Sequence, residues 1–251
     1  MGTSTSSRGP NNNSPLVPPW ADVDGAGSGP EPQPNRFRGF RTSLGRFVSS
    51  GDQTYLHKAL RGYARSATGG SAVGPRRFGA MAQAGGGLYG VLNQLRSDPD
   101  NAPVNLRALA GRSTREAINA IVEALVPENG DADRIRAALN EALAICLDGE
   151  AVFDFNNITD EVLMEVLVTY TAQCVFEQVV MDSDRAFAKA ETPRQAEDAE
   201  RDLVELVRVV TEKHMRPLLE GQLQAMTNEQ MQAAQLAAIR EVWHEWEGYQ
   251  P

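Results

Sequence analysis

The stretch that decides the fold is residues 159–179, TDEVLMEVLVTYTAQCVFEQV. Thr159 is a residue type that suits the N-cap of a helix. Beyond it, apolar side chains recur at helical spacing and occupy most of the helix circumference. A helix that is apolar on nearly every side is buried on nearly every side. We therefore predict a central helix here, covered by other helices.

Working outward from this stretch, we find helical spacing in most of the chain from Arg36 onward and no convincing strand. Further helix starts are indicated by capping or first-turn residues at Asp52, Pro75, Ser113 with Glu116, and Thr227 with Gln230. The run Gly85-Gly86-Gly87 predicts either a kink or a close approach of two helices. The expected fold is all-α, a helical bundle-like body.

Residues 1–35 have a different composition, with 7 of the 14 prolines and 5 glycines among Ser, Thr and Asn. Such a segment buries too little apolar surface to offset its ordering entropy, so we expect a flexible, disordered Pro/Gly/Ser-rich N-terminal tail. Leu16-Val17-Pro18-Pro19-Trp20 departs from this pattern. It is either a short docking motif for a partner or a segment that folds back onto the chain's own body.

Charge divides the remaining chain into a basic helical region, 36–96, and an acidic helical domain, 97–251. Residues 1–96 hold 11 Lys/Arg against 4 Asp/Glu, a net of +7, and residues 97–251 hold 13 against 29, a net of −16. These values account for the overall −9. The overall sign argues against general coating of nucleic acid, although a local basic patch stays open.

The start of the basic region combines aromatic and arginine residues. Phe37, Phe40, Leu44 and Phe47 share one helix face, and the arginines between them are Arg36, Arg38, Arg41 and Arg46. This pattern has two interpretations. The helix could bind RNA, DNA or anionic lipid, or the Phe residues could be core and the Arg residues solvated.

No pattern of catalytic or metal-binding residues occurs, so we expect no enzyme activity, no metal and no cofactor. The three histidines, His57, His214 and His244, are scattered without ligand spacing. Cys146 and Cys174 lie in apolar, helix-patterned surroundings typical of core residues. No signal peptide or membrane-spanning run is recognisable, which favours a soluble cytoplasmic protein.

The first residues carry the most unusual chemistry. Because the second residue is small, Met1 should be removed and Gly2 should become the terminal residue, with an unhindered amine. The Thr/Ser run behind Gly2 can enter a narrow groove. Met1 to Ser6 also fits the short N-myristoylation pattern, with Ser6 in the Ser/Thr position.

The chain resembles the QatB component of the Qat anti-phage defence system. The resemblance rests on the segments Met1-Gly2-Thr3-Ser4-Thr5-Ser6-Ser7, Ser14-Pro15-Leu16-Val17-Pro18-Pro19-Trp20, Phe37-Arg38-Gly39-Phe40-Arg41-Thr42-Ser43-Leu44-Gly45-Arg46-Phe47-Val48 and Arg76-Arg77-Phe78-Gly79. It implies a bacterial protein acting beside an ATPase, a TatD-like nuclease and QatC. QatC is similar to QueC, which makes a 7-deazaguanine precursor from a carboxylate and ATP.

From this resemblance we expect the chain to be the partner and substrate of its QueC-like neighbour, with Gly2 the modified residue. ATP and zinc would belong to that enzyme. The tail through about Trp20 would lie in its active-site channel, and the helical body would supply a docking surface with its Arg/Phe face. The expected partner-binding residues are Gly2, Thr3, Ser4, Thr5, Ser6, Leu16, Val17, Pro18, Pro19, Trp20, Arg38, Phe40, Arg41 and Arg46.

Two other functions stay open. In the first, the chain is a nucleic-acid- or membrane-binding adaptor that uses the Arg/Phe-rich helices of residues 36–78. In the second, the body is a structural scaffold for the ATPase and the tail is only a linker.

Overall fold

The computed structural model describes residues 14–22, 30–147 and 152–250. Within these ranges it contains helices and no strand, apart from one isolated bridge between Ser113 and Val152. The α-helices are α1 (Arg38–Ser50), α2 (Gln53–Gly62), α3 (Gly79–Ser97), α4 (Val104–Arg107), α5 (Thr114–Leu125), α6 (Ala132–Cys146), α7 (Asp160–Asp182), α8 (Pro193–Leu219) and α9 (Asn228–Glu247). The all-α prediction is confirmed.

Short helical turns connect these helices. A π-helical turn, η1 (Tyr63–Ala67), extends α2, and the 3-10 turn η2 (Gly74–Phe78) leads into α3. The other 3-10 turns are η3 (Pro99–Asn101), η4 (Phe155–Asn157) and η5 (Phe187–Lys189). Between α2 and α3 the chain therefore forms two helical turns separated by a bend at residues 68–73.

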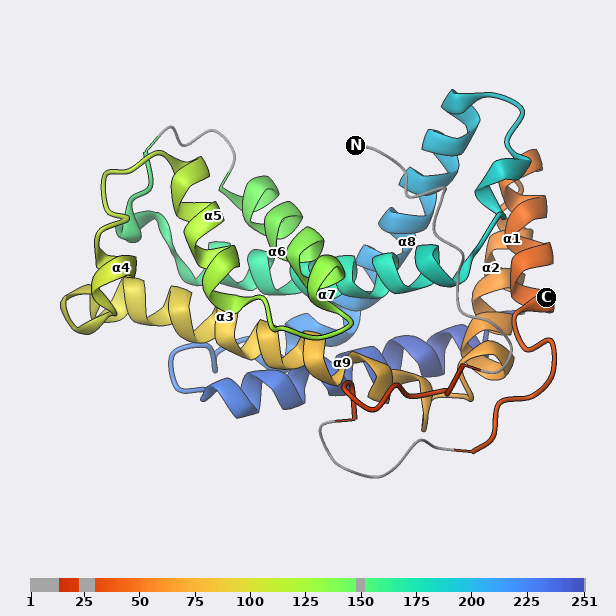
Figure 1. The fold of residues 1–251 in the computed structure, drawn as a ribbon, viewed down its shortest axis with the longest axis horizontal. Coiled ribbons are helices and arrows are strands. Elements are labelled where there is room, and N and C mark those ends of the chain that lie inside the picture. The colour runs from red at the N-terminus through yellow and green to blue at the C-terminus, as the bar shows by residue number, and fades with distance from the viewer. Residues whose placement is uncertain (1–13, 23–29, 148–151, 251) are drawn as a thin grey trace.

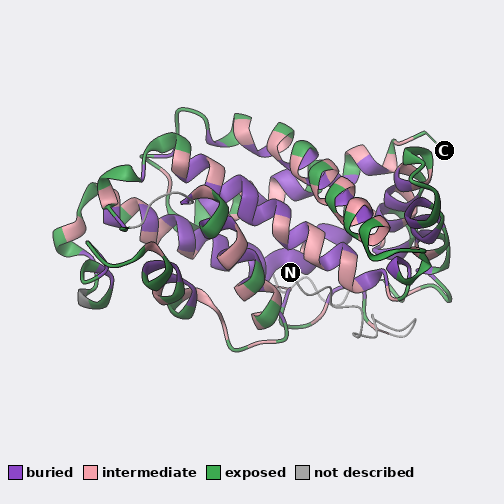
Figure 2. Ribbon diagram, turned by 90° about the horizontal axis from the view of Figure 1, so that it is seen from above, coloured by how far each residue is buried: buried purple, intermediate pink, exposed green. Residues whose placement is uncertain are grey.

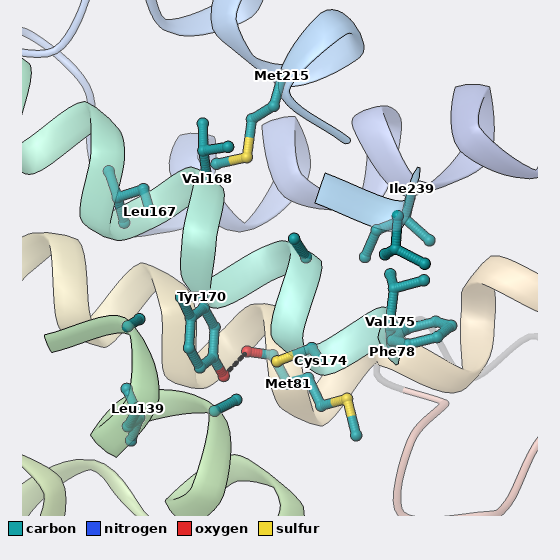
Figure 3. Close-up of a cluster of buried hydrophobic side chains, with 14 of the residues drawn as sticks. Phe78, Met81, Leu139, Leu167, Val168, Tyr170, Cys174, Val175, Met215 and Ile239 are labelled. Atoms are coloured by element: carbon teal, nitrogen blue, oxygen red, sulfur yellow. Dashed lines mark hydrogen bonds between the residues drawn. The ribbon is translucent and has the colours of Figure 1, made fainter. Parts of the chain in front are cut away.

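Helix α7 is the centre of the bundle, as its sequence predicted. It packs against α3, α6 and α8 (Figure 1), and most of its residues are buried (Figure 2). Thr159 caps its N-terminus by accepting a hydrogen bond from the Val162 amide. In the core, the Tyr170 hydroxyl donates to the Met81 carbonyl of α3 at 2.7 Å (Figure 3). This bond satisfies a buried polar group among aliphatic neighbours.

The buried side chains that pack with those of α7 in this cluster come from five other elements. Phe78 and Met81 belong to η2 and α3, Leu139 to α6, Met215 to α8 and Ile239 to α9 (Figure 3). All are buried, and they form one continuous core that includes residues from both the basic and the acidic region. The acidic and basic regions are therefore joined through shared apolar packing.

The glycine run in α3 serves close packing of two helices. Helix α3 continues without a break through Gly85-Gly86-Gly87. A Cβ at Gly86 would lie 2.5 Å from the Asn228 carbonyl oxygen, and one at Gly85 would lie 2.3 Å from the Gln235 side chain. Only glycine lets the α9 backbone approach α3 this closely.

None of the described helices is at once long enough and apolar enough to cross a lipid bilayer.

The predicted capping boxes of α5 and α9 are both present, with Ser113 bonded to Glu116 and Thr227 bonded to Gln230. Asp52 caps α2 by accepting from the Thr54 amide.

Leu167→Ala should lower the free energy of unfolding by about 2–5 kcal/mol, because it opens a cavity in a fully buried part of α7. The measurement is chemical denaturation followed by circular dichroism. Leu218→Ala in α8 is the matched control, since that side chain is 38% exposed. Equal losses from the two variants would contradict the central position of α7.

Candidate functional site: the seat of the N-terminal strap

Residues 14–22, which we call the strap, lie against the helical body. Leu16 is 4% exposed, and Val17 and Ala21 are fully buried. The Ala21 amide donates to the Pro18 carbonyl at 3.0 Å and so closes a turn. Trp20, by contrast, is 48% exposed. The motif Leu16–Trp20 thus folds back through its aliphatic residues while half of its tryptophan faces solvent.

Two glycines of the body make room for the strap. A Cβ on Gly69, which has a φ of +86°, would lie 3.1 Å from Leu16 Cδ1. A Cβ on Gly130, in the loop between α5 and α6, would lie 2.8 Å from the Trp20 ring. The strap therefore contacts the bend at residues 68–73 and also a loop of the acidic region.

Two arginines tie the strap at its ends. Arg36 Nη2 donates to the Ser14 carbonyl at 2.9 Å, and Arg76 Nη2 pairs with Asp22 Oδ1 at 2.9 Å. Arg36 is 5% exposed, and its Nε and Nη1 atoms have no hydrogen-bond partner within the described ranges. Burial and the neighbouring positive charge of Arg77 lower the pKa of Arg36. The donor to the Ser14 carbonyl is therefore an incompletely satisfied guanidinium.

A buried ionic cluster is centred on Asp182, at the C-terminal end of α7. The Asp182 side chain has no exposed surface. Its Oδ2 accepts from Tyr63 Oη and from Arg77 Nη1, each at 2.8 Å. Its Oδ1 accepts from Gln178 Nε2 at 3.1 Å, and the Asp182 carbonyl accepts from Arg41 Nε at 2.8 Å. The cluster joins α1, η1 and η2 to α7.

Further positive charge surrounds this carboxylate. Burial alone would lower the pKa of Arg77, but the attraction of Asp182 holds it above its ordinary value. Arg134 of α6 donates to Gln178 and to the buried Asp131. Burial and the charge of Arg77 lower the pKa of Arg134. Arg77 therefore bonds the Asp182 carboxylate directly, Arg41 bonds the Asp182 carbonyl, and Arg134 is linked to Asp182 through Gln178.

The predicted partner-binding residues are not gathered at one surface. Phe40 is fully buried and contacts the Tyr63 ring, with ring centroids 4.8 Å apart. Arg41 is half-buried, bonded to the Asp182 carbonyl and 3.9 Å from the Asp184 carboxylate. Arg38 and Arg46 are exposed. The Arg/Phe-rich start of the basic region thus consists of buried aromatics, two arginines bonded to the protein (Arg36 and Arg41) and two exposed arginines.

Within the Leu16–Trp20 motif, Pro18 is half-buried and Pro19 is exposed. The other predicted residues, Gly2, Thr3, Ser4, Thr5 and Ser6, lie outside the described residues.

Sequence reasoning missed Arg36, Arg77, Gln178 and Asp182 as a group. No local signal marked Asp182, since α7 carries other acidic residues, such as Asp160 and Glu161, that are exposed. Once it is buried, a carboxylate requires a partner. The identity of that partner depends on tertiary contacts between segments more than 100 residues apart.

Arg77→Met should lower the free energy of unfolding by about 3–5 kcal/mol, because it leaves the Asp182 carboxylate buried without its cation. Urea denaturation measures the loss. Arg38→Met is the matched control, and since Arg38 is exposed its effect should stay within about 0.5 kcal/mol. If Arg77→Met leaves the free energy of unfolding unchanged, Asp182 is not held as an ion pair.

The cluster also predicts a loss of stability in alkali. Burial and the nearby Asp182 charge hold the pKa of Tyr63 well above its ordinary value of 10.0. The unfolded chain therefore releases this proton first, and stability that is present below pH 10 is lost as the pH rises further. Tyr63→Phe should make the decline of unfolding free energy shallower by up to about 1.4 kcal/mol per pH unit above pH 10. Identical slopes would contradict the assignment.

Comparison with known proteins places this architecture in a family. No curated protein and no solved structure matches the chain. A family model described as the Qat anti-phage system associated protein QatB matches residues 69–246. The match begins after the strap and covers η2 through nearly the whole of α9. Because it spans well over half of the sequence, the chain belongs to the QatB family of Qat anti-phage system associated proteins.

Proposed function

We propose that this chain is a non-catalytic component of the Qat system and the substrate of a QueC-like partner, QatC. The partner conjugates a 7-deazaguanine to the amine of Gly2. Membership of an anti-phage system supports a partner within that system. The other partners implied by the resemblance are the system's ATPase and its TatD-like nuclease.

The reaction requires one free, uncharged amine. The QueC-like enzyme activates a deazaguanine carboxylate with ATP, giving an acyl adenylate and releasing pyrophosphate. The Gly2 nitrogen attacks the acyl carbon, AMP leaves, and the nitrogen loses a proton as the amide forms. With an ordinary α-amino pKa of about 7.7–8.0, roughly a tenth to a fifth of the amine is neutral at pH 7. Glycine adds no side chain to hinder the attack.

The observation that carries the proposal is the seated strap. With Leu16 and Val17 buried and Ser14 bonded to Arg36, residues 2–13 precede a fixed point on the body. A reactive terminus tethered to a docked body has a high effective concentration at the partner's active site. We therefore assign residues 2–13 to the enzyme channel. This segment is shorter than the stretch through Trp20 that the sequence suggested.

Intact mass and N-terminal peptide mass test the proposal directly. The chain is expressed with active QatC, with an inactive QatC, and alone. The expected result is an added deazaguanine amide on Gly2 only with the active enzyme. Gly2→Pro should block conjugation because its amine is secondary and hindered, whereas Gly2→Ala keeps a primary amine and should be modified more slowly.

A plain Gly2 amine in the presence of active QatC would refute the proposal. A myristoyl mass instead would favour membrane anchoring. Reversing the charges of the exposed Arg38 and Arg46 should leave the Gly2 mass unchanged, whereas an adaptor that binds nucleic acid or lipid would lose binding. Defence that survives deletion of residues 2–13 would favour the scaffold function.

A further inference from the structure

We propose that the strap is a length gauge: by holding the chain at Ser14, it sets how far Gly2 can reach from the body into the partner enzyme. The gauge rests on the proposed modification of Gly2. It adds the prediction that tail length, measured from the seated strap, controls the reaction.

The strap is built to hold a fixed position. Its apolar residues Leu16, Val17 and Ala21 are removed from solvent, and its two ends are tied by Arg36 and Arg76. Ala21 and Asp22 lie beside Pro75, Arg76 and Gly79 and beside Leu236 and Arg240 of α9. In Figure 1 the strap, drawn in red, lies near α9 and the start of α3. The strap thus contacts elements that the core holds rigidly together.

The strap is also releasable at its upstream end. The Ser14 carbonyl accepts from Arg36, and this guanidinium keeps two buried nitrogen atoms without partners in the described structure. Trp20 remains half exposed instead of filling a core pocket. Removing the burial of Val17 should therefore free the segment up to the Asp22–Arg76 pair without disturbing the bundle.

Chain geometry sets the distances. From Gly2 to Ser14 there are twelve residue steps, which span at most about 40–43 Å when extended. Deleting residues 8–13 removes six steps, or about 20 Å of reach. Releasing the strap as far as Asp22 adds eight steps, or about 26–29 Å. The released strap therefore more than compensates for the deletion.

This compensation gives a test with four chains: the full-length protein, a deletion of residues 8–13, Val17→Asp, and the two changes combined. The readout is the rate of Gly2 modification by QatC, followed by intact mass. The deletion should slow modification at least tenfold. Val17→Asp alone lengthens the tether from twelve to twenty residue steps and should slow modification about twofold, because effective concentration falls roughly as the −3/2 power of tether length. The combination should recover to within about threefold of it, because an aspartate cannot remain in the buried Val17 position.

Matched controls distinguish an effect of tail length on the modification rate from an effect of tail sequence. Replacing residues 8–13 by six Gly/Ser residues keeps the length and should leave the rate unchanged. Trp243 and Trp246 are fully buried, so increased acrylamide quenching of tryptophan fluorescence in Val17→Asp reports Trp20 leaving its seat. Circular dichroism checks the bundle, and Leu16→Ser replaces Val17→Asp if the latter fails to fold.

Failure of the length gauge and failure of the proposed function give different results. A deleted chain that is modified at the full rate overturns the gauge, as does a combined variant that stays slow although its strap is released. Hydrogen exchange of residues 14–22 that is already unprotected in the full-length chain also overturns it. An unmodified full-length chain beside active QatC refutes the proposed function itself, and the gauge with it.

Discussion

The buried carboxylate of Asp182 constrains the rest of the structure. A charge without exposed surface is tolerated only when cations and donors surround it. Tyr63 and Arg77 come from the basic region and Gln178 from α7, so these segments must take one relative position to satisfy it. Apolar packing alone tolerates small shifts between helices. The ionic cluster adds to the aliphatic core a requirement for one relative position of the basic region and α7.

The seat of the strap follows from this cluster. Arg36 directly precedes Phe37 and α1, and its guanidinium lies 4.7 Å from the Phe37 ring centroid, stacked on a fully packed core residue. The same helix start carries Arg41, which bonds the Asp182 backbone. Fixing α1 against α7 therefore also fixes the donor that holds Ser14. The position of the strap is thus linked to a buried carboxylate at the C-terminal end of α7.

The sequence allowed prediction of features that depend on nearby residues. The breadth of apolar residues in α7 indicated its central position, and Ser113 with Glu116 indicated a capping box because the two interact within one turn. The partners of Asp182 could not be predicted, since nothing local distinguishes Arg77 from the exposed Arg38. For Leu16–Trp20 the sequence left open a docking motif or a segment that folds back onto the body, and the structure shows Leu16 and Val17 buried. The sequence could not decide between the two, because Leu16 lies against a glycine bend more than 50 residues away.

The division between body and tail also explains where family similarity and the proposed chemistry lie. The family match covers residues 69–246, which supply the Arg77–Asp182 pair and most of the core. The proposed reaction takes place at Gly2, far upstream of that match. If the terminus of this chain is the substrate of a partner enzyme, the body contributes by positioning that terminus. Under this proposal the strap is the segment through which the body acts, since it is seated on the matched body at Gly69, Arg76 and Gly130.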